Sequence, residues 1–142
     1  MKNLLLVLFV LSTFCGCATS SIPTKEALVV PADRIFRTEK LPIDGNARAS
    51  FVRDTGFTGS GVYQNLFING KKAAALNPGE KVEFLLVPGE YIFGAIPTDP
   101  FGTHALNTID QDIKAGRNYF YRIQTDGNSF RTSIQRYLPE AE

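Results

Sequence analysis

Short segments in which apolar and polar residues alternate make up most of the chain from Asp33 onward, and turn residues separate them. The segment 81–87 is the clearest, with Val82, Phe84 and Leu86 on one side of an extended chain and mainly polar residues on the other. Such alternation is typical of a strand with one buried and one wet face. Because no window shows a sustained helical repeat, the pattern predicts an all-β sandwich of about seven to eight antiparallel strands.

The turn residues predict how neighbouring strands connect. An Asn-Gly pair at 69–70 lies between the strand-like runs 62–68 and 71–76, and it favours a type I′ hairpin because both residues tolerate positive φ. The Asn-Pro-Gly triplet at 77–79 predicts a second turn, since proline sets the first turn angle and glycine supplies the next. A Pro-Gly pair at 88–89 then leads into another strand.

The C-terminal part predicts a second hairpin. An Ala-Gly turn at 115–116 separates residues 105–114, with Ile109 and Ile113 on one face, from the alternating run 117–124. The Asp-Gly-Asn turn at 126–128 then leads into the last strand, 129–137. The inward residues expected in that strand are Phe130, Thr132 and Ile134. Two segments, Leu41–Asn46 and Pro97–His104, are predicted to be loops.

The N-terminus has the order of a secretory signal peptide. Lys2 supplies a positive charge, residues 4–11 form an unbroken apolar run, and mostly small residues follow up to Ser20. The apolar run is much shorter than the roughly 20 residues with which a helix crosses a bilayer. We therefore expect a cleaved leader and no retained membrane span.

The stretch that follows the apolar run resembles the lipobox of bacterial lipoproteins, in which a cysteine after small residues is joined to diacylglycerol and becomes the new N-terminus. Gly16 and Cys17 fit the two central positions, while Phe14 and Cys15 stand where leucine and a small residue are usual. The resemblance implies a signal peptide of residues 1–16, lipidation of Cys17, and a place in the bacterial cell envelope.

Two other interpretations of this region stay open. Cys15 could be the lipid acceptor, but Phe14 would then precede the cut, where a small side chain is needed. The chain could also be an ordinary secreted protein in which Cys17 is free or disulfide-bonded. After a cut before Cys17 a single cysteine remains, so no intramolecular disulfide can form. Ala18, in place of an aspartate, by the same resemblance favours the outer membrane of a Gram-negative cell, facing the periplasm.

The mature chain divides into two expected parts. Residues 20–31 show no clear periodicity and contain two prolines, so we expect a lipidated N-terminus and tether at 17–31, followed by a β-sandwich domain at 32–142. Without Lys2, 14 basic residues balance 14 acidic ones. This composition provides no basic field for nucleic acid, so we expect no nucleic-acid partner. The partners expected from the lipobox resemblance are the membrane, through the lipid, and another envelope protein.

Several turn motifs carry a further family resemblance. The sequences Ile-Asn-Gly-Lys at 68–71, Val-Pro-Gly-Glu-Tyr at 87–91, and Ala-Gly at 115–116 followed by Tyr-Phe-Tyr at 119–121 resemble, in order and spacing, an uncharacterised family of small bacterial lipoprotein domains related to PEGA-type β-sandwiches. The likeness covers about half of the mature chain, and the insert at 43–61 has no counterpart in it. It implies an immunoglobulin-like sandwich in the cell envelope without established catalysis.

His104 is the single histidine and lies in a predicted loop close to Asp99. A loop histidine beside a carboxylate is suited to general-base catalysis or metal binding, and equally to an exposed contact. No nucleophile motif such as Gly-x-Ser-x-Gly accompanies it. We therefore expect no catalytic role and regard His104 as a candidate partner-binding residue.

Two aspartates offer a second candidate for chemistry. Asp110 and Asp112 share one strand face and lie about 7 Å apart at a rise of about 3.3 Å per residue. This separation suits a calcium site or an acid/base pair, but no third acidic ligand follows at the spacing of a calcium loop. We expect both aspartates on the wet face, with no metal site and no cofactor.

The glycine-rich segment 56–61 lacks the Lys-Ser/Thr ending of a phosphate loop, so we expect a loop between strands, with Phe57 as a second candidate anchor for a partner. Aromatic residues elsewhere follow a period of two, which favours core pairs over a groove for sugar or peptide. This aromatic set consists of Tyr63, Phe67, Tyr91, Phe93, Tyr119, Phe120 and Tyr121.

The leading hypothesis is thus a lipid-anchored envelope protein that is not an enzyme and serves as a protein-interaction or structural module. The alternative is a binding module for a small ligand or glycan, with a pocket near the loops 56–61 and 97–104. A third hypothesis is an envelope hydrolase that uses His104 and a carboxylate.

Overall fold

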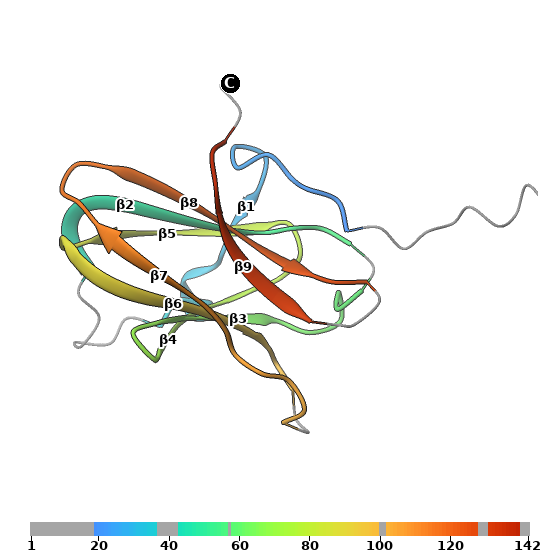
Figure 1. The fold of residues 1–142 in the computed structure, drawn as a ribbon. Helices are drawn as coiled ribbons and strands as arrows, with labels where there is room; N and C mark the ends of the chain where they lie inside the picture. Colours follow the sequence, from blue (N-terminus) through green and yellow to red (C-terminus); the bar gives the residue numbers. More distant parts are fainter. Residues whose placement is uncertain (1–18, 37–42, 57, 100–101, 128–130, 140–142) are drawn as a thin grey trace, which may run out of the picture.

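The computed structural model describes residues 19–36, 43–56, 58–99, 102–127 and 131–139. Within them nine strands form two sheets that pack face to face (Figure 1). The strands are β1 (Leu28–Val29), β2 (Ile43–Arg53), β3 (Gln64–Ile68), β4 (Lys71–Leu76), β5 (Glu80–Leu86), β6 (Gly89–Pro97), β7 (Asn107–Ile113), β8 (Asn118–Thr125) and β9 (Thr132–Tyr137). A single 3₁₀ turn, η1 (Ala32–Arg34), lies between β1 and β2.

The two sheets have different pairing patterns. The five-stranded sheet has the order β1-β5-β2-β8-β9, and the four-stranded sheet has the order β4-β3-β6-β7. Every pair in the four-stranded sheet is antiparallel, whereas β1 pairs with β5, and β2 with β8, in parallel. The predicted all-β sandwich is confirmed, and the five-stranded sheet is mixed because the chain crosses between sheets several times.

The turns at 69–70 and 77–79 lie where the sequence predicts them. Asn69 and Gly70 both have positive φ, at 49° and 74°, and join β3 to its antiparallel neighbour β4. This is the backbone that a type I′ turn requires. Gly79, with φ at 76°, lies in the turn between β4 and β5, which belong to different sheets.

The second predicted hairpin is wrong. Gly116 does turn the chain, with φ at 68°, but β7 pairs with β6 in one sheet while β8 pairs with β2 and β9 in the other. A sheet-crossing arch and a hairpin use similar turn residues, so the local sequence does not distinguish them. The crossing lets Ile113 and Tyr119 both enter the core, and the backbone N–H of Lys114 donates to the Tyr119 hydroxyl at 2.9 Å.

The observed C-terminal hairpins are β6–β7 and β8–β9. The β6–β7 loop occupies most of the predicted loop 97–104, although Pro97 is still part of β6. In the β8–β9 turn the backbone N–H of Asp126 donates to the carbonyl of Arg131 at 2.8 Å. The expected inward residues Thr132 and Ile134 are buried, and Phe130 lies outside the described residues.

The predicted loop at 41–46 is partly wrong, because β2 already begins at Ile43. The pairing with β5 contains a bulge there, since both Ile43 and Ala47 lie opposite Leu86. A Cβ atom at Gly45 would fall 1.8 Å from the Leu86 carbonyl oxygen. The sequence Asp44-Gly45-Asn46 suggests a turn. In the structure, however, Gly45 permits the close backbone approach that a bulge needs.

Aromatic rings from both sheets meet in the centre of the core. Phe51 of β2 stacks on Tyr121 of β8, with ring centroids 4.9 Å apart, and Phe93 of β6 lies 5.0 Å from Phe51 and 4.9 Å from Tyr121. The core interpretation is therefore confirmed for Phe93 and Tyr121, and also for Tyr91 and Tyr119. Tyr63 is exposed, and Phe67 and Phe120 are half-buried.

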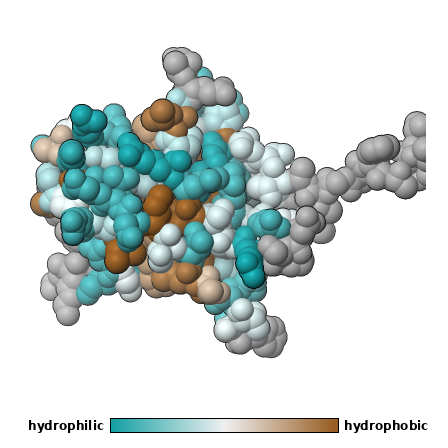
Figure 2. Space-filling view, in the orientation of Figure 1, coloured by the Kyte–Doolittle hydropathy of each residue, from teal (hydrophilic) through white to brown (hydrophobic). Residues whose placement is uncertain are grey.

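Hydrophilic residues dominate the face shown in Figure 2, around a small hydrophobic area in the region of β7 and β9. The alternation in the strands places hydrophilic residues on the surface and apolar residues in the core. In β5, for example, Val82, Phe84 and Leu86 are buried while Glu83 and Leu85 are exposed, as the sequence predicts.

Replacing Gly45 with alanine tests the bulge in β2. We expect the Gly45→Ala substitution to lower the free energy of unfolding by about 1–3 kcal/mol, because the new methyl group forces the backbones of β2 and β5 apart. Urea unfolding measures the change. Gly61→Ala is the matched control, since no atom lies within 4 Å of a Cβ at that position. Equal stabilities of the two variants would contradict the role given to Gly45.

Candidate functional site

Residues 19–31, which we call the N-terminal strap, run along the five-stranded sheet (Figure 1). The backbones of Ser20 and Thr55 exchange two hydrogen bonds of 2.9 and 3.1 Å. The Thr19 hydroxyl donates to the carbonyl of Thr125 at 2.8 Å. Farther along, the N–H of Leu28 donates to the carbonyl of Gly79 at 3.0 Å, where β1 joins β5.

The described part of the expected tether, residues 19–31, is therefore part of the domain. Ala27 and Val30 are 5% and 2% exposed, so this segment contributes to the buried interior although its sequence has no periodicity. Val52, near the end of β2, and Asp54, just after this strand, lie on the outer side of the sheet. Both are nevertheless buried, because the strap passes over them. Two isolated apolar residues and backbone pairing hold the strap, and neither produces a periodic pattern.

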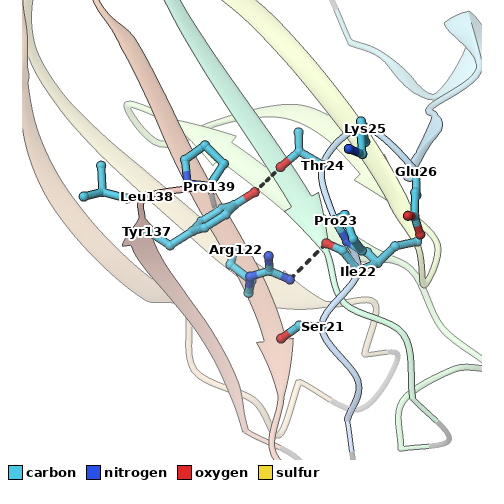
Figure 3. A pocket seen from close by; sticks show the side chains of 10 residues that line it. All are labelled: Ser21, Ile22, Pro23, Thr24, Lys25, Glu26, Arg122, Tyr137, Leu138 and Pro139. Carbon is cyan, nitrogen blue, oxygen red and sulfur yellow. Dashed lines mark hydrogen bonds between the residues drawn. The ribbon is translucent and has the colours of Figure 1, made fainter. Parts of the chain in front are cut away.

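A cleft of about 570 Å³ lies between the strap and the end of β9 (Figure 3). Strap residues 21–26 form one wall, and Tyr137, Leu138 and Pro139 form the other, with Arg122 of β8 between them. Tyr137 and Thr24 meet across the cleft through a hydrogen bond between their hydroxyl groups. Leu138 at the rim is 83% exposed. The cleft thus combines apolar residues with hydroxyl groups and with the charged side chains of Lys25, Glu26 and Arg122.

Arg122 makes three contacts below the cleft. Its guanidinium group forms an ion pair with the Asp54 carboxylate, donates to the Ile22 carbonyl at 3.3 Å, and lies 4.4 Å from the centroid of the Tyr137 ring. The Asp54 side chain is 1% exposed, and one of its oxygens, Oδ2, has no partner among the described residues. Because a buried carboxylate requires a counter-charge, Arg122 neutralises Asp54 and at the same time fixes the strap.

A second arginine, Arg53, holds the loop between β2 and β3. It is 3% exposed and donates to the carbonyl oxygens of Val62 and Leu76 at 2.7 Å and of Gly59 at 2.6 Å. Burial lowers the pKa of Arg53 to about 10, and the charge of Glu80 opposes this shift. The guanidinium group still carries its charge at neutral pH. The predicted loop at 56–61 is therefore confirmed as a link between strands, and Phe57 lies outside the described residues.

A third buried charge network joins the start of β5 to η1. The Arg34 guanidinium group donates to both carboxylate oxygens of Glu80, at 2.7 and 2.6 Å, and the N–H of Asn77 adds a bond of 2.7 Å to the same carboxylate. Burial alone would raise the pKa of Glu80. The hydrogen bonds from Arg34 and Asn77 and the charge of Arg34 outweigh burial and hold the pKa below its ordinary value.

His104 and Asp99 lie together in the β6–β7 loop. The Asp99 Oδ2 atom contacts His104 Nδ1 at 2.8 Å and accepts hydrogen bonds from the Thr103 hydroxyl at 2.8 Å and the His104 N–H at 3.1 Å. The Thr103 hydroxyl also lies 3.2 Å from Nδ1, the same nitrogen that faces Asp99. A catalytic triad instead needs its hydroxyl at the opposite ring nitrogen. These contacts therefore join Asp99 to Thr103 and His104 and stabilise the conformation of the loop.

Asp110 and Asp112 are exposed on the outer face of β7, as predicted, and Glu90 of β6 lies directly opposite Asp112. A second hollow of about 680 Å³ is lined by these acidic residues together with Asn69, Tyr91, Ile92 and Gln111. In the part of the chain that the structure describes, no group of three histidine, cysteine or acidic side chains could hold a metal ion. Neither this hollow nor the cleft is lined by described residues of the loops 56–61 or 97–104.

Cys17 lies outside the described residues. Across the segments that the structure describes, no helix has the length and apolar character needed to span a bilayer. The three arginine networks, in which Arg53 is buried and Arg34 and Arg122 are partly buried, were not predicted from the sequence. A signal was present for one of them, because Arg53 continues the inward series Ala47, Ala49 and Phe51 of β2 and thus breaks the alternation with a charge.

The Arg34–Glu80 pair predicts acid sensitivity. Because the folded-state pKa of Glu80 lies below the ordinary value of 4.5, the stabilisation is present above pH 4.5 and is lost as the pH falls below it. We expect Glu80→Gln to lose about 2 kcal/mol of unfolding free energy at pH 7, and progressively less below pH 4.5. Denaturant unfolding across this pH range measures the difference.

The exposed pair Arg48–Glu83, whose side chains are 52% and 40% exposed, provides the control. Glu83→Gln is expected to change stability by well under 1 kcal/mol at every pH, because water screens an exposed pair. A Glu80→Gln loss that stays constant down to the lowest pH would contradict the ionic origin of the effect.

Comparisons with known proteins assign this chain to no family: no protein-family model matches it, and no curated protein matches its sequence.

Proposed function

We propose that this chain is a lipid-anchored protein of the bacterial cell envelope, and that its sandwich is a non-catalytic interaction or structural module. One observation supports this proposal above the others. Thr19 and Ser20, which follow Cys17 by two and three residues, are hydrogen-bonded to Thr125 and Thr55 of the domain. Lipid on Cys17 would therefore attach directly beside a folded domain.

The open edge of the five-stranded sheet supports a role in protein interaction. Among the strands that the structure describes, β1 pairs only with β5, and its residues Leu28 and Val29 are 71% and 70% exposed. Two adjacent apolar residues on an open edge favour the addition of an extended segment from a partner, because an edge strand presents backbone groups that another strand can pair with. This edge replaces Phe57 and His104 as the first surface to test, while both residues stay candidate contacts.

The alternative function, binding of a small ligand or glycan, is supported by the cleft beneath the strap. Its volume of about 570 Å³ lies within the range of small-molecule sites, and Thr24, Tyr137 and Arg122 supply polar groups. However, Asp54 already neutralises Arg122, and the two hydroxyl groups already bond each other. A ligand that uses these three groups must compete with contacts they already make, so we rank the interaction module first.

Lipid attachment predicts a clear difference between two cysteine variants. We expect the wild-type protein from a bacterial membrane fraction to carry the mass of a diacylglycerol-based modification and to enter the detergent phase on detergent partitioning. Cys17→Ser should lose both properties, because the thioether needs the thiol of the cleavage-site cysteine. Cys15→Ser is the matched control and should keep both. An unmodified wild-type chain in the aqueous phase would refute the anchor.

Photocrosslinking from two positions separates the interaction module from the ligand site. We expect a photoreactive residue at Leu28 to capture envelope proteins in living cells, because this side chain lies on the open edge of β1. The same residue at Leu138 marks the rim of the cleft, and Lys114, whose side chain is 67% exposed just after β7, serves as the control position. Capture at Leu138 alone would favour binding at the cleft. Equal capture at all three positions would contradict a specific surface on β1.

A further inference from the structure

We propose that the sandwich is held at the membrane with one particular end toward the lipid headgroups. This end, which we call the strap end, consists of the described residues 54–56 and 58–63 of the β2–β3 loop and 126–127 and 131 of the β8–β9 turn. The proposal rests on the lipid anchor at Cys17 that is proposed above. The partner of the strap end is the phospholipid surface of the anchoring membrane.

The first described residues of the chain are fixed to the strap end. Thr19 is bound through its hydroxyl to Thr125 at the end of β8, and the two backbone bonds between Ser20 and Thr55 hold the next residue. Gly56 packs against Thr19 so closely that a Cβ atom there would lie 3.1 Å from the Thr19 Cα. In Figure 1 the chain approaches the domain from the side on which β8 ends and β9 begins. The entry point of the chain is therefore set by the fold.

Chain length then limits where the lipid can be. Thr19 follows Cys17 by two residues, which span at most about 7 Å even when fully extended. β8 is 8 residues long, from Asn118 to Thr125, and thus measures about 26 Å. The β7–β8 turn at Gly116 lies at the far end of this strand. A lipid on Cys17 can therefore reach the membrane beside the strap end and cannot bring the opposite end to the surface in its place.

The composition of the strap end is compatible with a headgroup surface. Within these two loops the exposed charges among the described residues are Asp126 and Arg131, one of each sign. The adjoining β6–β7 loop, bound through the Thr98 N–H to the Tyr63 carbonyl, adds the Asp99–His104 pair. Val62 and Tyr63 are 37% and 41% exposed, and tyrosine is favoured at the boundary between water and lipid. The charged groups Arg53 and Asp54 are buried and paired within the fold.

The opposite end carries the exposed basic residues Lys114 and Arg117. These residues would attract an anionic membrane only within about a Debye length, which is about 8 Å at physiological ionic strength. A strand length separates them from the strap end, so the short covalent connection outweighs this attraction. The β7–β8 and β5–β6 turns therefore project away from the membrane.

Energy transfer to labelled lipids tests the orientation. After lipidation the mature chain has no free cysteine, so Ser60→Cys and Ala115→Cys each provide one thiol for a donor dye, at the strap end and at the opposite end. The lipidated variants are reconstituted into vesicles of phosphatidylethanolamine and phosphatidylglycerol that contain a headgroup-labelled acceptor lipid. We expect transfer from residue 60 to be at least about threefold more efficient than from residue 115, because a strand length separates the two positions.

A longer connection provides the control. Insertion of a Gly/Ser linker of about 12 residues between Ala18 and Thr19 adds a root-mean-square reach of about 20 Å, and it should largely abolish the difference between the two dyes. Equal transfer from both positions, or stronger transfer from residue 115, in a chain whose lipid is confirmed by mass would overturn the orientation alone. A chain that carries no lipid and does not bind vesicles would overturn the anchor and, with it, the orientation.

Discussion

The contact between the two sheets through Phe51, Phe93 and Tyr121 is the interaction on which the other features of the fold depend. These rings come from β2, β6 and β8, so they bring together segments that are far apart in the sequence. Burial of large aromatic side chains contributes strongly to the stability of a domain whose described residues include no cysteine and hence no disulfide. Burial also raises the pKa of Tyr121, whose hydroxyl group has no partner among the described residues. The Tyr121 ring thus contacts Phe51 and Phe93 closely, while its hydroxyl group is buried without a partner among the described residues.

Once the sheets are packed, buried and partly buried arginines fix the segments that cross the ends and edges of the sheets. Arg53 binds three backbone carbonyl groups around the β2–β3 loop, and Arg34 joins η1 to the carboxylate of Glu80. Arg122 connects the strap to the sheet through Asp54 and Ile22. A guanidinium group presents several donors in a fixed geometry, which suits it to satisfying carbonyl and carboxylate groups that have lost their water. These charges thus have structural partners and define where the chain enters the domain.

This entry point connects the fold to the proposed function. An anchored domain on a long tether samples many orientations, whereas a domain whose chain enters at a fixed point next to its lipid presents a restricted set of surfaces to the compartment. The open edge at β1 and the cleft beneath the strap are both formed by residues of the strap itself. The same segment therefore helps to shape the two candidate binding surfaces and, under the proposed anchor, would set the position of the domain at the membrane.

The sequence alone determined the class of the fold, because alternation and turn chemistry are local properties. The Asn69-Gly70 hairpin, the two faces of β5 and the loop around His104 could be predicted from neighbouring residues. Tertiary structure decided which sheet each strand joins, so that Gly116 turns an arch where a hairpin was expected. It also decided that residues 19–31 pack on the domain and that Arg122 pairs with Asp54, 68 positions earlier. These features depend on contacts between residues that are distant in the chain, and a pattern read within a short window contains no information about such contacts.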